Sequence, residues 1–146
     1  MRRLIAGCLV AVLTTGCSQK APFEELADGP CTSAQEELVN QHISGQINAL
    51  AKQDWKLAYT FASANFQGIV PLDQFTFIIA AQYPMLVENQ SYTFDKCTLI
   101  DGGVVQEVRV TTEDEVSNIT YALSVSESAL GIESAVIGEA ETGLST

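Results

Sequence analysis

The single histidine, His42, is the side chain best suited to proton transfer at neutral pH. It lies at the edge of an apolar helical stripe, on the flank shared with Gln35 and Gln46. Two interpretations stay open: a general base that faces the mouth of a pocket, or a histidine at the boundary of the core. One histidine is too few for a histidine-based metal site, and the sequence lacks HExxH, P-loop and nucleophile-elbow motifs. We therefore expect no metal, no cofactor and no catalytic residue, with His42 as the histidine candidate should there be one.

Three acidic residues of the expected strands, Asp95, Glu107 and Glu133, could join a site only if their side chains point inward. Strand alternation instead places Glu107 beside Arg109 and Thr111, a pattern typical of a solvated face.

Cys17 indicates a different chemistry, because it closes a segment typical of an export signal. Residues 1–3 are a short cationic start, residues 4–13 are mainly apolar, and small residues follow. A membrane-spanning helix needs about 20 apolar residues, so a short anchor or a buried strand is the weaker interpretation. The sequence before Cys17 resembles a bacterial lipobox, which implies cleavage after residue 16 and a diacylglyceryl thioether on Cys17. We expect a signal peptide at 1–16 and a tether at 17–30.

That resemblance implies an exported protein held on a bacterial membrane by lipid. In a host with two membranes, the expected place is the periplasmic face of the outer membrane. A protein with two or more acyl chains stays anchored, whereas a single chain binds only marginally.

Cys31 and Cys97 are the two cysteines that remain after signal cleavage and lipidation. In an oxidising compartment an even pair predicts a disulfide bond, and two independent buried thiols are the alternative. The bond would fasten the segment entering the first helix to the sheet.

Aromatic side chains could line an apolar ligand pocket with a few polar tips. The same residues could equally form a core in which each phenol finds a hydrogen-bond partner. The candidates for pocket lining are Tyr59, Phe66, Tyr83, Tyr92, Phe94 and Tyr121.

The composition fits one globular domain. The chain has 146 residues, 47% of them hydrophobic, with 7 Lys and Arg against 18 Asp and Glu and a net charge of −11. At this length roughly two-thirds of the unfolded chain's surface can be buried. Because phosphate binding needs a basic face, we expect no nucleic-acid partner.

The first half of the chain has helical periodicity. Ser33 with Glu36 fits a capping box, and an apolar stripe then predicts a helix over residues 33–52, in which Gly45 costs about 1 kcal/mol against Ala. Asp54 is typical of the cap of a second, shorter helix. Pro71 suits the first position of a third helix, which should stop near Tyr83 because a proline follows.

After Pro84 the apolar period changes from 3.6 to 2. Turn residues at 101–103 and 113–114 separate alternating segments, and a last strand is expected over 131–137. Three N-terminal helices followed by about four antiparallel strands predict an α+β domain over 31–138, with helices on one face of a curved sheet and a flexible tail at 139–146.

These elements resemble a known family. Residues 43–63 look like the opening helices of the NTF2-like (SnoaL-like) superfamily, through Gln46, Ala49-Leu50, Asp54-Trp55, Ala58-Tyr59 and Phe61-Ala62-Ser63. Phe75, Tyr83-Pro84 and the segment 104–108 look more narrowly like its DUF4864 members. The resemblance implies a cone-shaped, cystatin-like fold in which a bent sheet wraps a long first helix and can enclose an apolar pocket. It implies no specific chemistry, since one fold hosts many functions.

We expect an envelope lipoprotein whose domain binds a partner protein or a small apolar ligand without catalysis. A small lyase or isomerase that uses the cone pocket is the first alternative. An oligomeric structural subunit of an envelope assembly, such as a homodimer, is the second.

Overall fold

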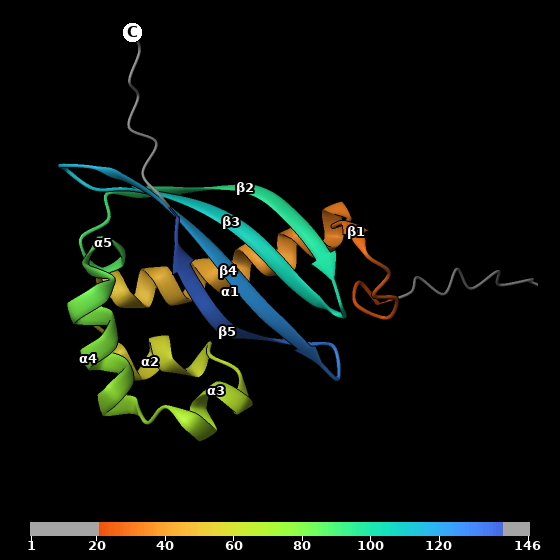
Figure 1. The fold of residues 1–146 in the computed structure, drawn as a ribbon, viewed down its shortest axis with the longest axis horizontal. Coiled ribbons are helices and arrows are strands. Elements are labelled where there is room, and N and C mark those ends of the chain that lie inside the picture. Colours follow the sequence, from red (N-terminus) through yellow and green to blue (C-terminus); the bar gives the residue numbers. More distant parts are fainter. Residues whose placement is uncertain (1–20, 139–146) are drawn as a thin grey trace, which may run out of the picture.

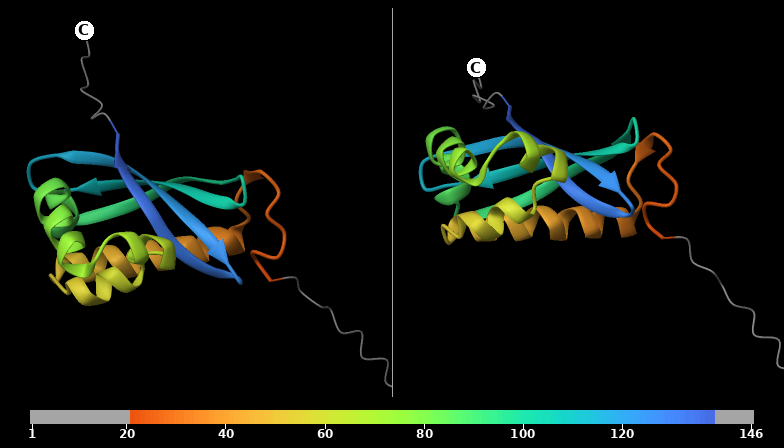
Figure 2. Two further views of the ribbon diagram at one scale, coloured as in Figure 1. Left: turned by 60° about the horizontal axis from the view of Figure 1, so that its bottom comes forward. Right: turned by 90° about the horizontal axis from the view of Figure 1, so that it is seen from below.

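The computed structural model describes residues 21–138, which form an α+β domain (Figure 1). A five-stranded antiparallel sheet, ordered β1-β2-β3-β4-β5, packs against helices on one face (Figure 2). The expected signal peptide, Cys17 and the tail at 139–146 lie outside the described residues.

The long helix α1, Ser33–Ala51, lies along the sheet and supplies much of the core. Val39, Ile43, Ile47 and Leu50 form the expected apolar stripe and are fully buried. The capping box lies one residue earlier than predicted: Thr32 Oγ1 accepts from the Gln35 N–H at 3.2 Å, and Gln35 Oε1 accepts from the Thr32 N–H at 2.8 Å. Gln35 can fill this role because its Nε2 also donates to the Pro22 carbonyl, at 2.6 Å.

Four shorter helices follow α1. The helix α2, Trp55–Thr60, begins after Asp54, whose Oδ1 accepts from the Leu57 N–H at 3.1 Å, as predicted. The helix α4, Leu72–Gln82, corresponds to the third predicted helix, with Pro71 as its N-cap residue rather than its first residue.

The sequence did not predict α3, Ala64–Ile69, or α5, Pro84–Val87. The helix α3 has no fully buried residue, so it has no apolar stripe to detect. Pro84 disfavours helix at the residue before it, which ends α4. The same proline begins α5, because its fixed φ suits the first helical position.

The predicted meander forms strands β2 (Ser91–Ile100), β3 (Gly103–Thr111), β4 (Val116–Ser126) and β5 (Ala129–Ile137). Its inner face alternates cleanly in β3 and β4, where buried residues such as Val108 and Ile119 face the helices. Register shifts interrupt the ladder in β2 and in β5.

A fifth strand, β1 (Gly29–Pro30), pairs with β2 and lies next to the disulfide between Cys31 and Cys97, which confirms the predicted bond. Residues 21–30 fall within the expected tether, yet they contact the domain. Phe23 is buried in the core, and Asp28 Oδ1 accepts from the Asp101 N–H at 2.9 Å.

Gly45 on α1 marks a close contact, which differs from the prediction of a merely tolerated glycine. A Cβ at this position would lie 2.4 Å from Cζ of Phe61. The missing side chain lets the segment after α2 approach α1, so the residue is required by packing rather than tolerated.

Candidate functional site

A cavity of about 180 Å³ lies between the helices and strand β5. Its wall is mostly apolar and includes Phe66 of α3, Phe75 and Ile79 of α4, and Ile132 of β5. Ile132, Glu133, Ser134 and Ala135 of β5, an edge strand of the sheet, also line the cavity.

Aromatic contacts hold the apolar wall in place. Phe75 and Ile79 lie four residues apart on α4 and are both buried, as the helical spacing of the sequence predicted. The ring of Phe66 packs edge-on against Phe75 at a centroid distance of 6.2 Å, and Tyr59 packs behind Phe75 at 5.4 Å. The Tyr59 hydroxyl donates to the Val70 carbonyl at 2.6 Å, which fixes the chain between α3 and α4.

Two sets of hydrogen bonds join the helical layer to the edge of β5. At one place the Ser63 N–H donates to the Ile132 carbonyl and the Ile132 N–H donates to the Phe61 carbonyl, both at 2.9 Å. At the other, the Tyr83 hydroxyl donates to the Ala135 carbonyl at 2.5 Å. Between them lie the β5 residues that line the cavity.

Polar groups reach this cavity from opposite sides. Gln46 of α1 is 4% exposed, and its Nε2 donates to the Ala58 carbonyl at 3.3 Å. Glu133 of β5 is half-buried, and Asn65 Nδ2 of α3 donates to its Oε2 at 3.4 Å. The cavity can therefore hold an apolar group and offer polar contacts to a ligand.

Of the six aromatic residues predicted to line a pocket, Phe66 and Tyr83 line this cavity. Tyr59 packs behind its wall. Tyr92 and Phe94 pack edge-on against each other at 5.8 Å, and the Tyr92 hydroxyl donates to Asn48 Oδ1 at 2.8 Å, away from the cavity lining.

Tyr121 lies in the core and is fully buried. Its hydroxyl has no hydrogen-bond partner among residues 21–138. Burial raises the pKa of Tyr121 far above its ordinary value of 10.0, and the nearby Tyr83 and Tyr92 raise it further, so the phenol stays neutral.

The structure places His42 outside the cavity. Its Nε2 lies 2.8 Å from the Phe61 carbonyl, and its ring packs edge-on against Phe61 at 5.2 Å. A carbonyl only accepts, so Nε2 carries the proton in this contact. His42 borders a shallow depression with Phe23 and Leu130.

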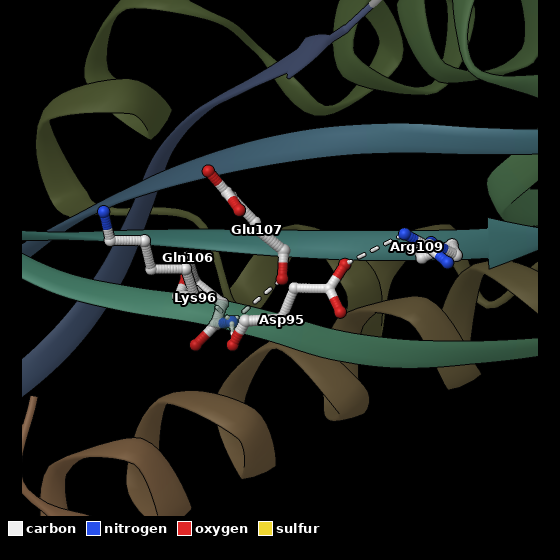
Figure 3. A network of polar contacts seen from close by, with 5 residues as sticks. All are labelled: Asp95, Lys96, Gln106, Glu107 and Arg109. Carbon is white, nitrogen blue, oxygen red and sulfur yellow. Dashed lines mark hydrogen bonds and ion pairs between the residues drawn. The ribbon is translucent and has the colours of Figure 1, made fainter. Parts of the chain in front are cut away.

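The outer face of the sheet carries charged residues, with Asp95 and Glu107 both exposed (Figure 3). Arg109 Nη2 lies 3.8 Å from Asp95 Oδ2. Gln106 instead points to the inner side, and its Nε2 donates to the carbonyls of Asp95, Lys96 and Glu107 where β2 is irregular. Two of the three acidic candidates therefore lie away from the cavity.

Glu133 was one of the three acidic candidates and lines the cavity, whereas Gln46 was not predicted as a cavity residue. Gln46 was named on the helix flank shared with His42 and in the family resemblance, and a polar residue beside an apolar helical stripe is a usable signal for a cavity residue. The position of Glu133 in the cavity lining depends on an irregularity in β5 that simple alternation does not reveal.

Within residues 21–138, no group of three His, Cys, Asp or Glu side chains is placed to hold a metal ion. The same part of the chain contains no helix that combines the length and the apolar character needed to cross a membrane.

A long helix packed on an antiparallel meander, with a cavity at the sheet edge, defines this chain as a small α+β domain. A family model described as Domain of unknown function (DUF4864) matches residues 32–142, and the chain belongs to this family. No curated protein and no solved structure gives a significant match.

Proposed function

We propose that this chain is an exported, lipid-anchored protein whose domain is an NTF2-like cone that binds a small apolar ligand without catalysis. The observation that carries the proposal is the apolar cavity between α3, α4 and β5. A long helix along one face of a meandering sheet supports the assignment to the superfamily.

The size of the cavity restricts the ligand. An apolar cavity of about 150 Å³ can remain dry and bind benzene. The cavity here measures about 180 Å³. Its ligand would therefore carry an apolar body of about the size of one aromatic ring, held by Phe66, Phe75 and Ile79.

Binding is favoured over catalysis because the phenol that lines the cavity, Tyr83, donates its proton to the Ala135 carbonyl, which leaves Glu133 without an acid partner among the described lining residues. His42 hydrogen-bonds to the Phe61 carbonyl elsewhere. Glu133 is the one charged residue among the described residues that line the cavity. The alternative of a lyase or isomerase would need a proton donor and an acceptor facing the same ligand.

Ligand binding can be tested with benzene and toluene as probes, by following protein NMR shifts and thermal unfolding. Ala135→Leu adds volume to a residue that lines the cavity, so we expect it to abolish probe binding. Val136→Leu is the matched control, because the Val136 side chain is 60% exposed and does not line the cavity. Unchanged shifts in the wild-type protein at saturating probe would refute the proposal.

The anchor rests on the sequence around Cys17. Lipid rather than the protein surface would bind the membrane, because a chain of net charge −11 is repelled by anionic headgroups. Mass measurement of the mature protein should show an acylated Cys17 as the first residue, and Cys17→Ser should release the protein from membranes. A membrane fraction unchanged by Cys17→Ser contradicts the anchor.

A further inference from the structure

We infer that the cavity selects a ligand that joins a small apolar body to a cationic group, such as a protonated amine, with Glu133 as its partner. This inference deepens the proposed function and rests on it. Three observations on the described residues carry it: the register of β5, the charges around the cavity, and the position of the carboxylate.

The first observation is an extra residue in β5. Ala122 pairs with Ser134, but Leu123 pairs with Ile132, so Glu133 has no partner on β4. Regular alternation would place the residue after the buried Ile132 on the outer face. A bulge changes the direction of side chains locally, and bulges often lie beside binding sites. Here Glu133 lines the cavity and meets Asn65 of α3.

The second observation is the absence of balancing positive charge. None of the elements that line the cavity, α1, α3, α4, α5 and β5, contains a Lys or Arg within its described bounds. Within residues 21–138, the polar contact of the Glu133 carboxylate is with the neutral amide of Asn65, at 3.4 Å. An incoming cation therefore meets an unneutralised carboxylate, whereas an anionic ligand is repelled.

The third observation is that Glu133 remains partly exposed while the wall behind it is apolar. A carboxylate in this position keeps water contact when the cavity is empty, so it avoids the large cost of burying an unpaired charge. A ligand can then bury its apolar body against Phe75 and Ile79 while its cationic end stays at the carboxylate. Charge-assisted hydrogen bonds are stronger than neutral ones, which gives selectivity.

The test compares three probes of similar size that differ in charge: benzylammonium, benzyl alcohol and benzoate. By NMR titration of the full domain, we expect benzylammonium to bind roughly fivefold more tightly than benzyl alcohol, with benzoate weakest. Glu133→Gln should remove this preference, so that benzylammonium binds no more tightly than benzyl alcohol. Glu107→Gln makes the same charge change on the exposed outer face and should leave all three affinities unchanged.

Each outcome separates the inference from the proposed function. Benzyl alcohol binding with no preference for benzylammonium overturns the inference and leaves the cavity proposal standing, whereas no binding by any probe overturns both. If Glu133→Gln weakens the binding of benzylammonium and of benzyl alcohol equally, the inference is also overturned. The carboxylate would then only support the shape of the cavity. If Glu133→Gln does not fold, the wild-type protein can be titrated at low and high ionic strength instead. Its preference for benzylammonium over benzyl alcohol must shrink at high ionic strength, and a salt-independent preference overturns the inference.

Discussion

At the residue scale, two of the three buried side-chain polar atoms that lack a hydrogen-bond partner within residues 21–138 lie on neighbouring strands. The Tyr121 hydroxyl and Gln106 Oε1 are both buried without a hydrogen-bond partner in the described part of the chain. The two residues face each other across β3 and β4. The amide nitrogen of Gln106 is satisfied as a donor, because it hydrogen-bonds to backbone carbonyls where β2 is irregular. For Tyr121, no contact within residues 21–138 offsets the cost of burying its hydroxyl.

Tyr121→Phe should therefore be at least as stable as the wild type at neutral pH, because an unsatisfied buried hydroxyl costs about 1–3 kcal/mol. The matched control is Tyr92→Phe, which removes a hydroxyl that donates to Asn48 Oδ1 and should lose about 1 kcal/mol. Urea denaturation of both variants measures the difference. A loss in Tyr121→Phe as large as that in Tyr92→Phe would contradict this account.

Tyr121 also predicts that the stability of the wild-type protein falls at alkaline pH. Burial raises the pKa of Tyr121 in the folded protein above its ordinary value of 10.0, so the unfolded chain releases the proton first as pH rises. The contribution of this proton equilibrium to the free energy of unfolding is fully present below about pH 10. It falls by about 1.4 kcal/mol per pH unit above that value. Tyr121→Phe should lack this contribution, so its stability relative to the wild type should rise between about pH 9 and pH 11. A pH-independent difference between the two proteins would contradict it.

At the scale of elements, local periodicity decided which parts of the fold could be predicted. The helix α1 and the strands β3 and β4 repeat one pattern over many residues, so the sequence alone located them. The helices α3 and α5 are too short to show a stripe. The displaced pairing around Glu133 depends on contacts between β4 and β5, and a single strand's sequence does not contain that information. The wall of the cavity was therefore predictable on α4 and unpredictable on β5.

Helix propensity and packing oppose each other at Gly45 of α1. Alanine favours a helix over glycine by about 1 kcal/mol. A Cβ at residue 45, however, would lie 2.4 Å from Phe61 Cζ. The ring would have to turn to make room for the methyl group, which would disturb its edge-on contact with His42.

Gly45→Ala should therefore destabilise the domain by about 1–3 kcal/mol, the usual cost of overpacking. Gly68→Ala in α3 is the matched control, because no atom lies within 4 Å of its added Cβ, and it should be neutral or stabilising by up to about 1 kcal/mol. Thermal and chemical denaturation measure both changes. Equal stabilisation by the two substitutions would show that α1 and Phe61 are not in close contact.

At the scale of the whole molecule, the disulfide connects the start of the domain to its sheet. Cys31 follows β1, Cys97 lies in β2, and the Cys31 N–H also donates to the Cys97 carbonyl at 3.1 Å. The segment ahead of this point covers the core with Phe23. Phe23 and β1 precede the disulfide along the chain, so these contacts and the bond together hold this segment on the sheet.

The double substitution Cys31→Ser with Cys97→Ser should destabilise the domain by roughly 4 kcal/mol, because the bond closes a loop with a sequence separation of 66 residues. This loss corresponds to a fall of on the order of 10 °C in Tm. A reductant should lower the Tm of the wild-type protein by a similar amount and leave the double variant unchanged, which separates the loss of the bond from a packing effect of serine. The proposed cavity lies away from both cysteines, so probe binding by the folded double variant should match the wild type. If the double variant kept the wild-type Tm, β1 and Phe23 alone would suffice to hold the start of the domain on the sheet.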